Sequence, residues 1–437
     1  MTLNIRNFSC FKVSLFAVAL GFANSVQAQG LSATEKKIIA SVNQNMTATE
    51  HLLEQVVNIN SGTLNIAGVQ KVGEVFGQEL DGLGFKTNWV RLPDSLQRAG
   101  HLVAQRKGKK GKKLFLIGHL DTVFEPDMPA GSFTRLNDST ATGQGVNDMK
   151  GGDVVIIAAL KALAANGLLK NTSITVYFTG DEENSGKPSR ISRHDFIQKA
   201  KESDVALAFE NAVNLNTVAT ARRGSSTWEL KVQGQQRHSS GIFSKEAGYG
   251  AIFEAARILD QFRETLSQEK YLTFSPGLIG GGTEVTLANG RTEALGKTNI
   301  ISRTVVATGD LRFLSETQKE EARSKMKNIV AQNLSGTSAQ ITFTDGIPAM
   351  EPTKENDQLA QMVSDISQKM GLGVVKAGDP GARGAGDISY VAEYVPCLDG
   401  LGASGSGAHA PGETINLKEL PLIIQRTALL IYRLTRS

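Results

Sequence analysis

The sequence predicts an α/β fold that a small α+β segment interrupts. Over residues 31–220, short apolar segments rich in β-forming residues alternate with amphipathic segments of helical period. This alternation favours a sheet with helices on both faces. From about residue 221, strand-like segments follow one another with only two helices between them, and after about residue 345 the first pattern returns. An insertion therefore splits the host domain.

The predicted elements of the host domain follow the spacing of its apolar residues. Gly84 is a stop signal for the second of its early helices. We expect helices over residues 50–58, 69–83, 356–370 and 420–434, and strands over 114–120, 173–179, 205–210 and 394–399.

The inserted segment combines strands with two longer helices. We expect strands over residues 227–232, 282–287, 304–314 and 339–343, and helices over 249–266 and 316–334. These expectations divide the chain into an N-terminal segment (1–28), a first part of the host domain (29–219), an inserted domain (220–345) and a second part of the host domain (346–437).

Composition excludes several classes of protein. The 437 residues are 40% hydrophobic and 21% charged, which excludes collagen-like, disordered and coiled-coil chains. A net charge of +4 is too even for an electrostatic nucleic-acid binder. With two Cys, neither a disulfide framework nor a thiolate zinc cluster is possible. Any metal must be held by carboxylates and by some of the six His.

The N-terminus has the pattern of a secretory signal. Arg6 and Lys12 precede an apolar run over residues 13–23, and small residues precede a cleavage site after about Ala28. The alternative is a membrane anchor, but a run of about ten apolar residues is well short of the ~20 that span a bilayer. We expect an exported protein without a membrane span, most simply a periplasmic one. Cleavage would leave Cys397 as the single cysteine.

The stretch over residues 106–113 is strongly basic. Such a run can mark a patch that binds polyanions. Because the sequence supplies no matching basic face, we expect a solvated hairpin tip between two strands instead.

Titratable side chains collect where predicted strands end. His119 and Asp121 lie two residues apart on one strand and so point to the same side. A carboxylate beside an imidazole fixes its tautomer and strengthens the other ring nitrogen as a metal ligand. This pair favours a functional site over an isolated surface histidine.

Four other segments carry candidate residues. Asp148 lies in a glycine-flanked turn before a helix and could equally be a helix cap. The acidic run 181–183 follows a buried strand, where a metal ion with one free general base explains it better than a solvated loop. Glu210 ends another strand, and His409 lies in a glycine-rich loop. Since ligands of open α/β folds gather at the carboxyl ends of strands, we expect these residues to meet.

This ordered set of motifs resembles that of the di-zinc exopeptidases, which include glutamate carboxypeptidase, aminoacylase and succinyl-diaminopimelate desuccinylase. The resemblance covers essentially the whole mature chain and is strongest for the glutamate carboxypeptidase branch. It implies an α/β/α catalytic domain with a mixed, mostly parallel sheet and a ferredoxin-like lid domain. It also implies two Zn²⁺ per subunit, although Co or Mn could occupy such a site.

The resemblance assigns roles to the motif residues. It implies two sets of three metal ligands that share one bridging carboxylate. These are His119, Asp148 and Glu210 for one zinc, and Asp148, Glu183 and His409 for the other. Asp121 would orient His119, and Glu182 would be the general base. The family also has a cis peptide after the bridging residue, here Asp148–Met149.

The resemblance extends to the inserted segment. His238 matches a lid histidine that helps to stabilise the oxyanion, often from a partner subunit, so we expect a homodimer formed through this domain. Asn299 and Arg312 match groups that hold a substrate carboxylate. Glutamate carboxypeptidases carry a further Arg near the end of the lid. Residues 344–350 contain none, although Arg383 could replace it.

These expectations lead to a secreted, metal-dependent carboxypeptidase that hydrolyses an amide bond beside a free carboxylate. Its substrate would be a small peptide, or, in the alternative within the same chemistry, an N-acyl amino acid. A periplasmic solute-binding protein is disfavoured because binding needs no general base such as Glu182. A serine hydrolase is disfavoured because the Gly-x-Ser-x-Gly motif is absent.

Overall fold

A mixed six-stranded sheet, in the order β1-β2-β6-β3-β7-β16, forms the centre of the fold. The computed structural model describes residues 30–128, 131–288 and 290–436, so the predicted signal segment lies outside the described residues. Strands β6, β3, β7 and β16 run parallel, whereas β2 is antiparallel to β1 and β6. The strands are β1 (Lys86–Val90), β2 (His101–Arg106), β3 (Lys110–His119), β6 (Thr172–Thr179), β7 (Val205–Ala208) and β16 (Cys397–Leu398).

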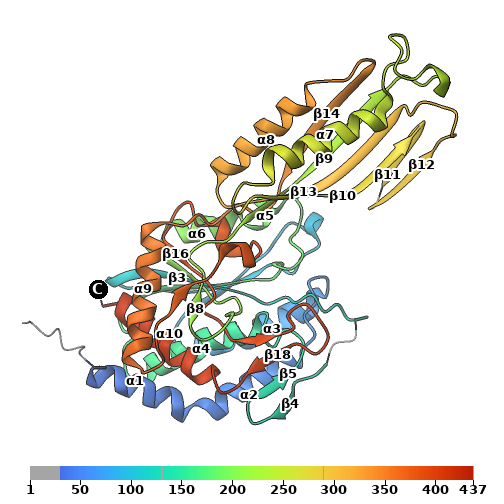
Figure 1. The fold of residues 1–437 in the computed structure, drawn as a ribbon. Helices are drawn as coiled ribbons and strands as arrows, with labels where there is room; N and C mark the ends of the chain where they lie inside the picture. Colours follow the sequence, from blue (N-terminus) through green and yellow to red (C-terminus); the bar gives the residue numbers. More distant parts are fainter. Residues whose placement is uncertain (1–29, 129–130, 289, 437) are drawn as a thin grey trace, which may run out of the picture. The chain divides into compact units, whose positions relative to one another are not determined.

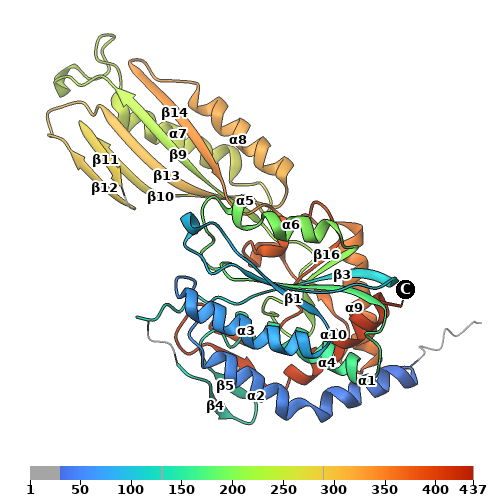
Figure 2. The same ribbon diagram turned by 180° about the vertical axis from the view of Figure 1, so that it is seen from behind.

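Alternate residues of the central strands pack against helices on opposite faces of this sheet. On β3, Leu114 and Leu116 join the largest core, whereas Phe115 and Ile117 join a second core with Phe196 of α6. Helices cover both faces (Figures 1 and 2), which confirms the predicted α/β/α class. The helices are α1 (Ala33–Gln44), α2 (Met46–Val57), α3 (Ile66–Gly82), α4 (Lys150–Ala165), α5 (Ser189–Ser192), α6 (His194–Lys201), α9 (Lys354–Lys369) and α10 (Leu420–Leu434).

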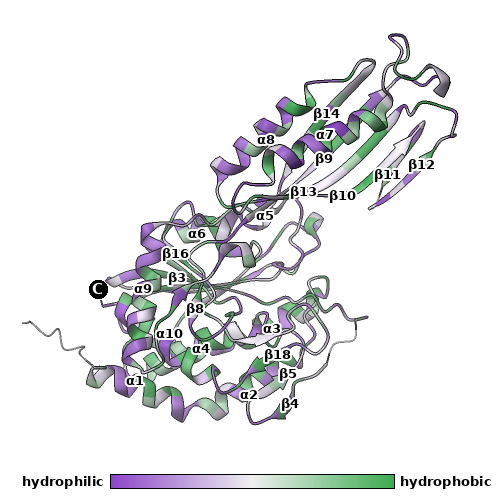
Figure 3. Cartoon of the chain, viewed as in Figure 1, coloured by the Kyte–Doolittle hydropathy of each residue, from purple (hydrophilic) through white to green (hydrophobic). Residues whose placement is uncertain are grey.

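Burial differs between the inner and outer helices. α4 packs against α1, α2, α3 and α10 as well as β3, and nearly all of its side chains are buried. After Asp153, α4 is apolar on nearly all sides, with Lys161 the one charged residue, and such a helix requires an enclosed position. In contrast, α1 and α8 (Glu316–Val330) carry both hydrophilic and hydrophobic residues along their length (Figure 3), as half-exposed helices do.

The predicted insertion has a sheet of its own. Four antiparallel strands in the order β10-β13-β9-β14, with helices α7 and α8, make the βαββαβ arrangement of a ferredoxin-like unit. Alternate β9 residues Trp228, Leu230 and Val232 form a core with these helices. The elements are β9 (Gly224–Gly234), α7 (Gly250–Leu266), β10 (Thr273–Gly282), β11 (Glu284–Ala288), β12 (Arg291–Leu295), β13 (Thr304–Phe313) and β14 (Thr337–Asp345). The domain boundaries themselves stay a prediction.

A small sheet joins distant parts of the chain near the end of β3. Its strands, in the order β17-β18-β5-β4, place the segment after residue 404 beside the segment before α4. They are β17 (Gly405–Ser406), β18 (Thr414–Asn416), β5 (Thr140–Thr142) and β4 (Thr134–Asn137), while β8 (Thr217–Val218) pairs with β15 (Lys376–Ala377) elsewhere. The loop with His409 connects β17 and β18.

One strand was missed and two local predictions were wrong. The strand expected over 282–287 is β11, whereas β10, just before it, was not predicted because it is rich in glycine and buries few side chains. The strand expected over 394–399 is reduced to β16, since Pro396 has no N–H to donate. The basic stretch is not a hairpin tip, because β6 lies between β2 and β3 and the stretch crosses over its start. Among the described residues, no helix has the length and hydropathy needed to cross a bilayer.

Candidate metal centre

Three adjacent parallel strands deliver the predicted site residues to one edge of the central sheet. His119 is the last residue of β3, the run 181–183 follows β6, and Glu210 follows β7. Asp148 lies just before α4, and the loop between β17 and β18 brings His409 to the same place. Because parallel strands end at a common edge, residues far apart in sequence form one cluster here.

The two carboxylate oxygens of Asp148 face two different groups of side chains. Its Oδ1 lies 3.3 Å from His119 Nε2, which in turn is 3.6 Å from Glu210 Oε1. Its Oδ2 lies 3.2 Å from His409 Nε2, which is also 3.2 Å from Glu183 Oε2. The arrangement has one histidine and one further carboxylate on each side of a shared aspartate, and it can therefore serve two cations with Asp148 between them.

Asp121 organises the cluster from beneath. His119 Nδ1 lies 2.9 Å from the backbone carbonyl oxygen of Asp121, which leaves Nε2 directed at the cluster. The Asp121 carboxylate accepts hydrogen bonds from the N–H groups of Glu182 (3.0 Å) and Glu183 (3.1 Å) and from the hydroxyl of Thr63 (2.6 Å). Asp121 thus positions both glutamates as well as the histidine: its carbonyl oxygen makes the hydrogen bond to His119, and its carboxylate Oδ1 lies 3.6 Å from the same Nδ1.

The side chains of the cluster fit a bound metal ion. Within the described residues, His119 Nε2 and Glu183 Oε1 are buried and have no hydrogen-bond partner. Buried polar atoms in native proteins are normally satisfied, and an imidazole nitrogen with a carboxylate oxygen is a typical zinc ligand set. Two groups in the described chain have ligand atoms close enough to share an ion, namely His119, Glu182 and Glu210, and His119, Asp148 and Glu183.

Electrostatics at the cluster also favour a cation. Burial, together with the charge of Asp148, raises the pKa of Glu210 to about 8. Burial likewise raises the pKa of Glu182 well above its usual range, with the charge of Glu210 adding to the effect. Hydrogen bonds that His409 donates to the carboxylates of Asp148 and Glu183 raise its pKa to about 11. So many carboxylates in one buried place repel one another, and a divalent cation would relieve this repulsion.

Glu413 ties the His409 loop to the turn that carries Asp148. Its buried carboxylate accepts hydrogen bonds from the N–H groups of Gly145 (2.9 Å), Asn147 (2.7 Å) and Asp148 (2.7 Å). The Asp148–Met149 peptide bond is cis, as the resemblance implied. Glu413 lies four residues after His409 and was given no role from sequence, because nothing in the spacing shows that it reaches back across more than 260 residues.

A cavity of about 320 Å³ opens beside the cluster. Asp148, Glu182, Glu210 and His409 line it together with two arginines, Arg222 and Arg383. The guanidinium of Arg222 donates to Asp399 (2.5 Å) and to the carbonyl oxygen of Gly384 (2.7 Å). That of Arg383 donates to the carbonyl oxygen of Asn211 (2.9 Å). Arg222 was missed from sequence, and its only signal is its position shortly after β8.

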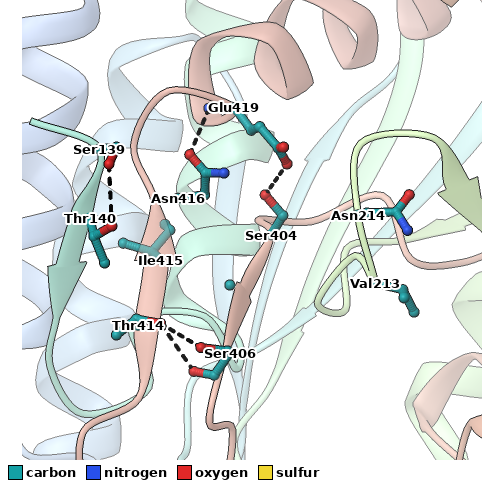
Figure 4. Close-up of a pocket in the computed structure, with 11 residues that line it drawn as sticks. Ser139, Thr140, Val213, Asn214, Ser404, Ser406, Thr414, Ile415, Asn416 and Glu419 are labelled. Carbon is teal, nitrogen blue, oxygen red and sulfur yellow. Dashed lines mark hydrogen bonds between the residues drawn. The ribbon is translucent and has the colours of Figure 1, made fainter. Parts of the chain in front are cut away.

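A second pocket, of about 290 Å³, is lined by strands β17 and β18 of the small sheet and by the loop that carries Val213 (Figure 4). Val213 lines both this pocket and the cavity at the cluster. Ser404 donates to Glu419 (2.6 Å), and Ser406 lies 2.9 Å from the hydroxyl of Thr414. With hydroxyl, amide and carboxylate groups on its walls, this pocket suits a polar group rather than an apolar one.

The residues predicted in the inserted segment lie elsewhere. His238 is exposed and accepts a hydrogen bond from the N–H of Ser240, and the adjacent residue pairs with the backbone of Asn299. Arg312, on β13, donates to Asp310 (2.7 Å). None of these three lines the cavity at the cluster. The structure therefore brings His238 and Asn299 together but does not join them or Arg312 to the candidate metal ligands.

Comparison with known proteins agrees with this geometry. Residues 115–433 match the model of peptidase family M20/M25/M40. The chain is 27% identical over 386 residues to carboxypeptidase G2 of Pseudomonas sp. (strain RS-16), covering 87% of each chain. It is 23% identical over 386 residues to succinyl-diaminopimelate desuccinylase of Pelagibacter ubique, covering 84% of this chain and 94% of the relative.

Solved structures share the fold. A tripeptidase from Staphylococcus aureus superposes with a TM-score of 0.67 at 18% identity, over 90% of this chain and 99% of that one. A dinuclear metal-binding peptidase of the M20 family from Bacillus subtilis superposes with a TM-score of 0.63 at 14% identity, over 90% and 99%. The family match spans well over half of the sequence. The chain belongs to peptidase family M20/M25/M40 and is a metal-dependent hydrolase of that family.

Proposed function

We propose that this hydrolase is a carboxypeptidase that cleaves the amide bond beside a terminal amino acid with a free carboxylate. The observation that carries the proposal is the arrangement around Asp148, whose two oxygens face two histidine–carboxylate pairs, with Glu182 in the same cavity. When bound there, two divalent ions, by default zinc, would polarise the scissile carbonyl and lower the pKa of a water molecule.

Glu182 is the proposed general base. It lines the cavity, and its backbone is held by Asp121. Burial raises the pKa of Glu182 well above its usual range, which suits a group that accepts the proton of the attacking water and then delivers it to the leaving amine. Glu183, one residue later, faces His409 and so has a different role as a ligand.

A free carboxylate on the substrate is supported by the two arginines of the cavity. Arg222 and Arg383 lie on the same walls as Glu182 and Glu210, and a guanidinium pairs well with a carboxylate. Arg383 is also the residue that sequence suggested as a replacement for the missing lid arginine. The same chemistry would accept an N-acyl amino acid, so hydrolysis of matched dipeptide and N-acyl amino acid panels decides between the two substrate classes.

The test of this function is the substitution Glu182→Gln, which keeps the size of the side chain and removes its basicity. We expect the variant to retain its bound metal while kcat falls by about 10²–10⁴-fold. Glu393→Gln, at an exposed position outside the cavity, is the matched control and should keep full activity. Full activity of Glu182→Gln, or purified wild type that binds no divalent metal, would refute the mechanism.

We also propose export through residues 1–28 and a homodimer in which His238 serves the partner's site. The support for the second point is that His238 is exposed and lies outside the cavity of its own chain. Mixing the inactive variants His238→Ala and Glu182→Gln should restore activity. In a mixed dimer, the His238→Ala subunit keeps its Glu182 and receives His238 from the Glu182→Gln subunit, so one site is complete. A monomeric enzyme with full activity would contradict this assembly.

A further inference from the structure

The basic stretch between β2 and β3 is held firmly against its neighbours rather than extended into solvent. The N–H groups of Lys109 and Lys110 both donate to the carbonyl oxygen of Asn171, at 3.0 and 2.9 Å. A Cβ on Gly108 would lie 2.1 Å from the same oxygen, so the crossing is close to the backbone beneath it. The lysines of this stretch therefore project from a fixed backbone.

Cations from two other segments join this stretch. Lys170 directly precedes Asn171. Gly111 packs on the backbone of Thr435, the residue before Arg436, and Arg436 donates to the carbonyl oxygen of Leu168 (2.6 Å). We define the basic edge as Lys107, Lys109, Lys110, Lys112, Lys113, Lys170 and Arg436.

The charges of the basic edge are uncompensated. Within the described residues, none of its seven cations has a carboxylate in ion-pair distance, and its six lysines are exposed. Two acids adjoin the edge: Asp204, whose carboxylate accepts the N–H of Lys113 (2.8 Å), and Glu202, which lines the same hollow as Lys107 and Lys113. The whole chain carries a net charge of only +4, and the basic edge alone contributes seven positive charges. The remainder of the chain is therefore net negative, and the positive charge is concentrated at this edge.

A hollow of about 360 Å³ lies in the basic edge. Lys107 and Lys113 line it together with the hydroxyl-bearing residues Ser173, Thr175 and Ser203. Arg106 and Glu202 contribute to its walls as well. Ammonium and hydroxyl groups are the donors that bind phosphate oxygens, so the hollow fits a phosphate-bearing headgroup.

The position of this edge in the fold indicates what it faces. Lys110 begins β3 and His119 ends it, so about 30 Å of strand separate the basic edge from the candidate metal centre. Helix α1 also begins near this edge, since Glu35 pairs with Arg433 (2.7 Å), two residues before Thr435, whose backbone Gly111 contacts.

We propose that the basic edge docks the enzyme on a membrane surface rich in anionic phospholipid, with the catalytic cavity directed away from it. Clusters of four to eight Lys and Arg on a protein surface bind anionic lipid in this way. The attraction is electrostatic and will weaken as salt shortens its range. Docking leaves the hydrolysis of a small soluble substrate unchanged, because no residue of the edge lines the cavity at the metal centre.

The test is co-sedimentation of the full chain with vesicles of phosphatidylglycerol and phosphatidylcholine, against vesicles of phosphatidylcholine alone. The edge variant carries five Lys→Gln substitutions, at Lys107, Lys109, Lys110, Lys112 and Lys113. The control variant carries the same loss of charge at exposed lysines elsewhere, namely Lys245, Lys297, Lys354, Lys376 and Lys418. A lighter variant, Lys109→Glu with Lys112→Glu, provides a second measurement that perturbs only two side chains.

Wild type and the control variant should bind anionic vesicles more tightly than neutral ones, and both edge variants should lose this preference. The loss for the five-lysine variant should be at least about tenfold at 0.1 M salt, with unchanged hydrolysis of a soluble substrate. Equal losses in the edge and control variants, or equal binding of wild type to both kinds of vesicle, would overturn the proposal. Binding of inorganic polyphosphate without binding of anionic vesicles would overturn it too.

Discussion

Arg193 is the position at which the structure makes its most direct prediction about stability. Its side chain is fully buried at the start of α6 and joins two aspartates. Its Nε donates to Asp387 (2.7 Å), its Nη1 donates to the carboxylate of Asp181, and its Nη2 donates to the Asp181 carbonyl oxygen (3.1 Å). Asp181 immediately precedes Glu182, so this ion pair also anchors the loop that carries the proposed general base.

The substitution Arg193→Met leaves two buried carboxylates without their cation. Burial raises the pKa of Asp181, but the charges of Arg193 and His101, together with hydrogen bonds from Gly186 and Ser192, hold that pKa below its ordinary value. Breaking a buried pair by removing one partner costs about 3–5 kcal/mol, and we expect a loss of this size in the free energy of unfolding. Part of it should return when Asp181→Asn and Asp387→Asn are added, because the uncompensated charges then disappear.

Urea unfolding of the metal-loaded enzyme measures this effect. The matched control is Arg263→Met, since Arg263 is an exposed helix residue with two acidic neighbours and its loss should change little. The pKa of Asp181 is lowered, so the stability it contributes is present above its unfolded pKa and is lost as pH falls. The gap between wild type and Arg193→Met should therefore narrow on acidification. Equal urea midpoints for Arg193→Met and Arg263→Met at neutral pH would refute the reasoning.

Three other perturbations test the site and the fold. Removing divalent metal with a chelator should abolish hydrolysis and lower the melting temperature, and adding zinc should restore both. Hydrolysis that survives in the metal-free enzyme would contradict the metal centre. Glu413→Ala leaves three N–H groups near Asp148 without their acceptor, so metal affinity or kcat/KM should fall about 10–100-fold, as titration with zinc and steady-state kinetics will show. Burial raises the pKa of Glu35, but hydrogen bonds from Ser32 and Arg433 lower it below its ordinary value. Its contribution to stability is therefore present above its unfolded pKa and lost as pH falls, and Glu35→Gln should unfold with a weaker dependence on acid pH than wild type.

Much of the central fold was predictable because its signals are local. Strand β3 alternates Leu114 and Leu116 with Phe115 and Ile117, and both faces are apolar because helices cover both. The same applies to α4, whose apolar run identifies a buried helix. Prediction failed where a strand lacked such a signal. Glycine-rich β10 is an example, because most of its residues are exposed and four of them have no side chain to mark a buried face.

The candidate site was partly predictable for a related reason. His119 and Asp121 share one strand, and Glu183 and Glu210 follow two others, so the rule that parallel strands end at one edge was enough to group them. No local signal could show that Asp121 holds the N–H groups of both glutamates, or that Thr63 donates to it.

The sequence by itself determined which chemistry is available: an α/β framework, a candidate ligand set of histidines and carboxylates, and a basic stretch over residues 106–113. Only the tertiary structure decided how these groups meet. Arg193 reaches an aspartate 194 residues away, and the insertion of β6 between β2 and β3 turns a presumed hairpin tip into an anchored edge. The physical reason is that periodicity reports which face of an element is buried, whereas long-range pairs and strand order depend on how all the elements pack together.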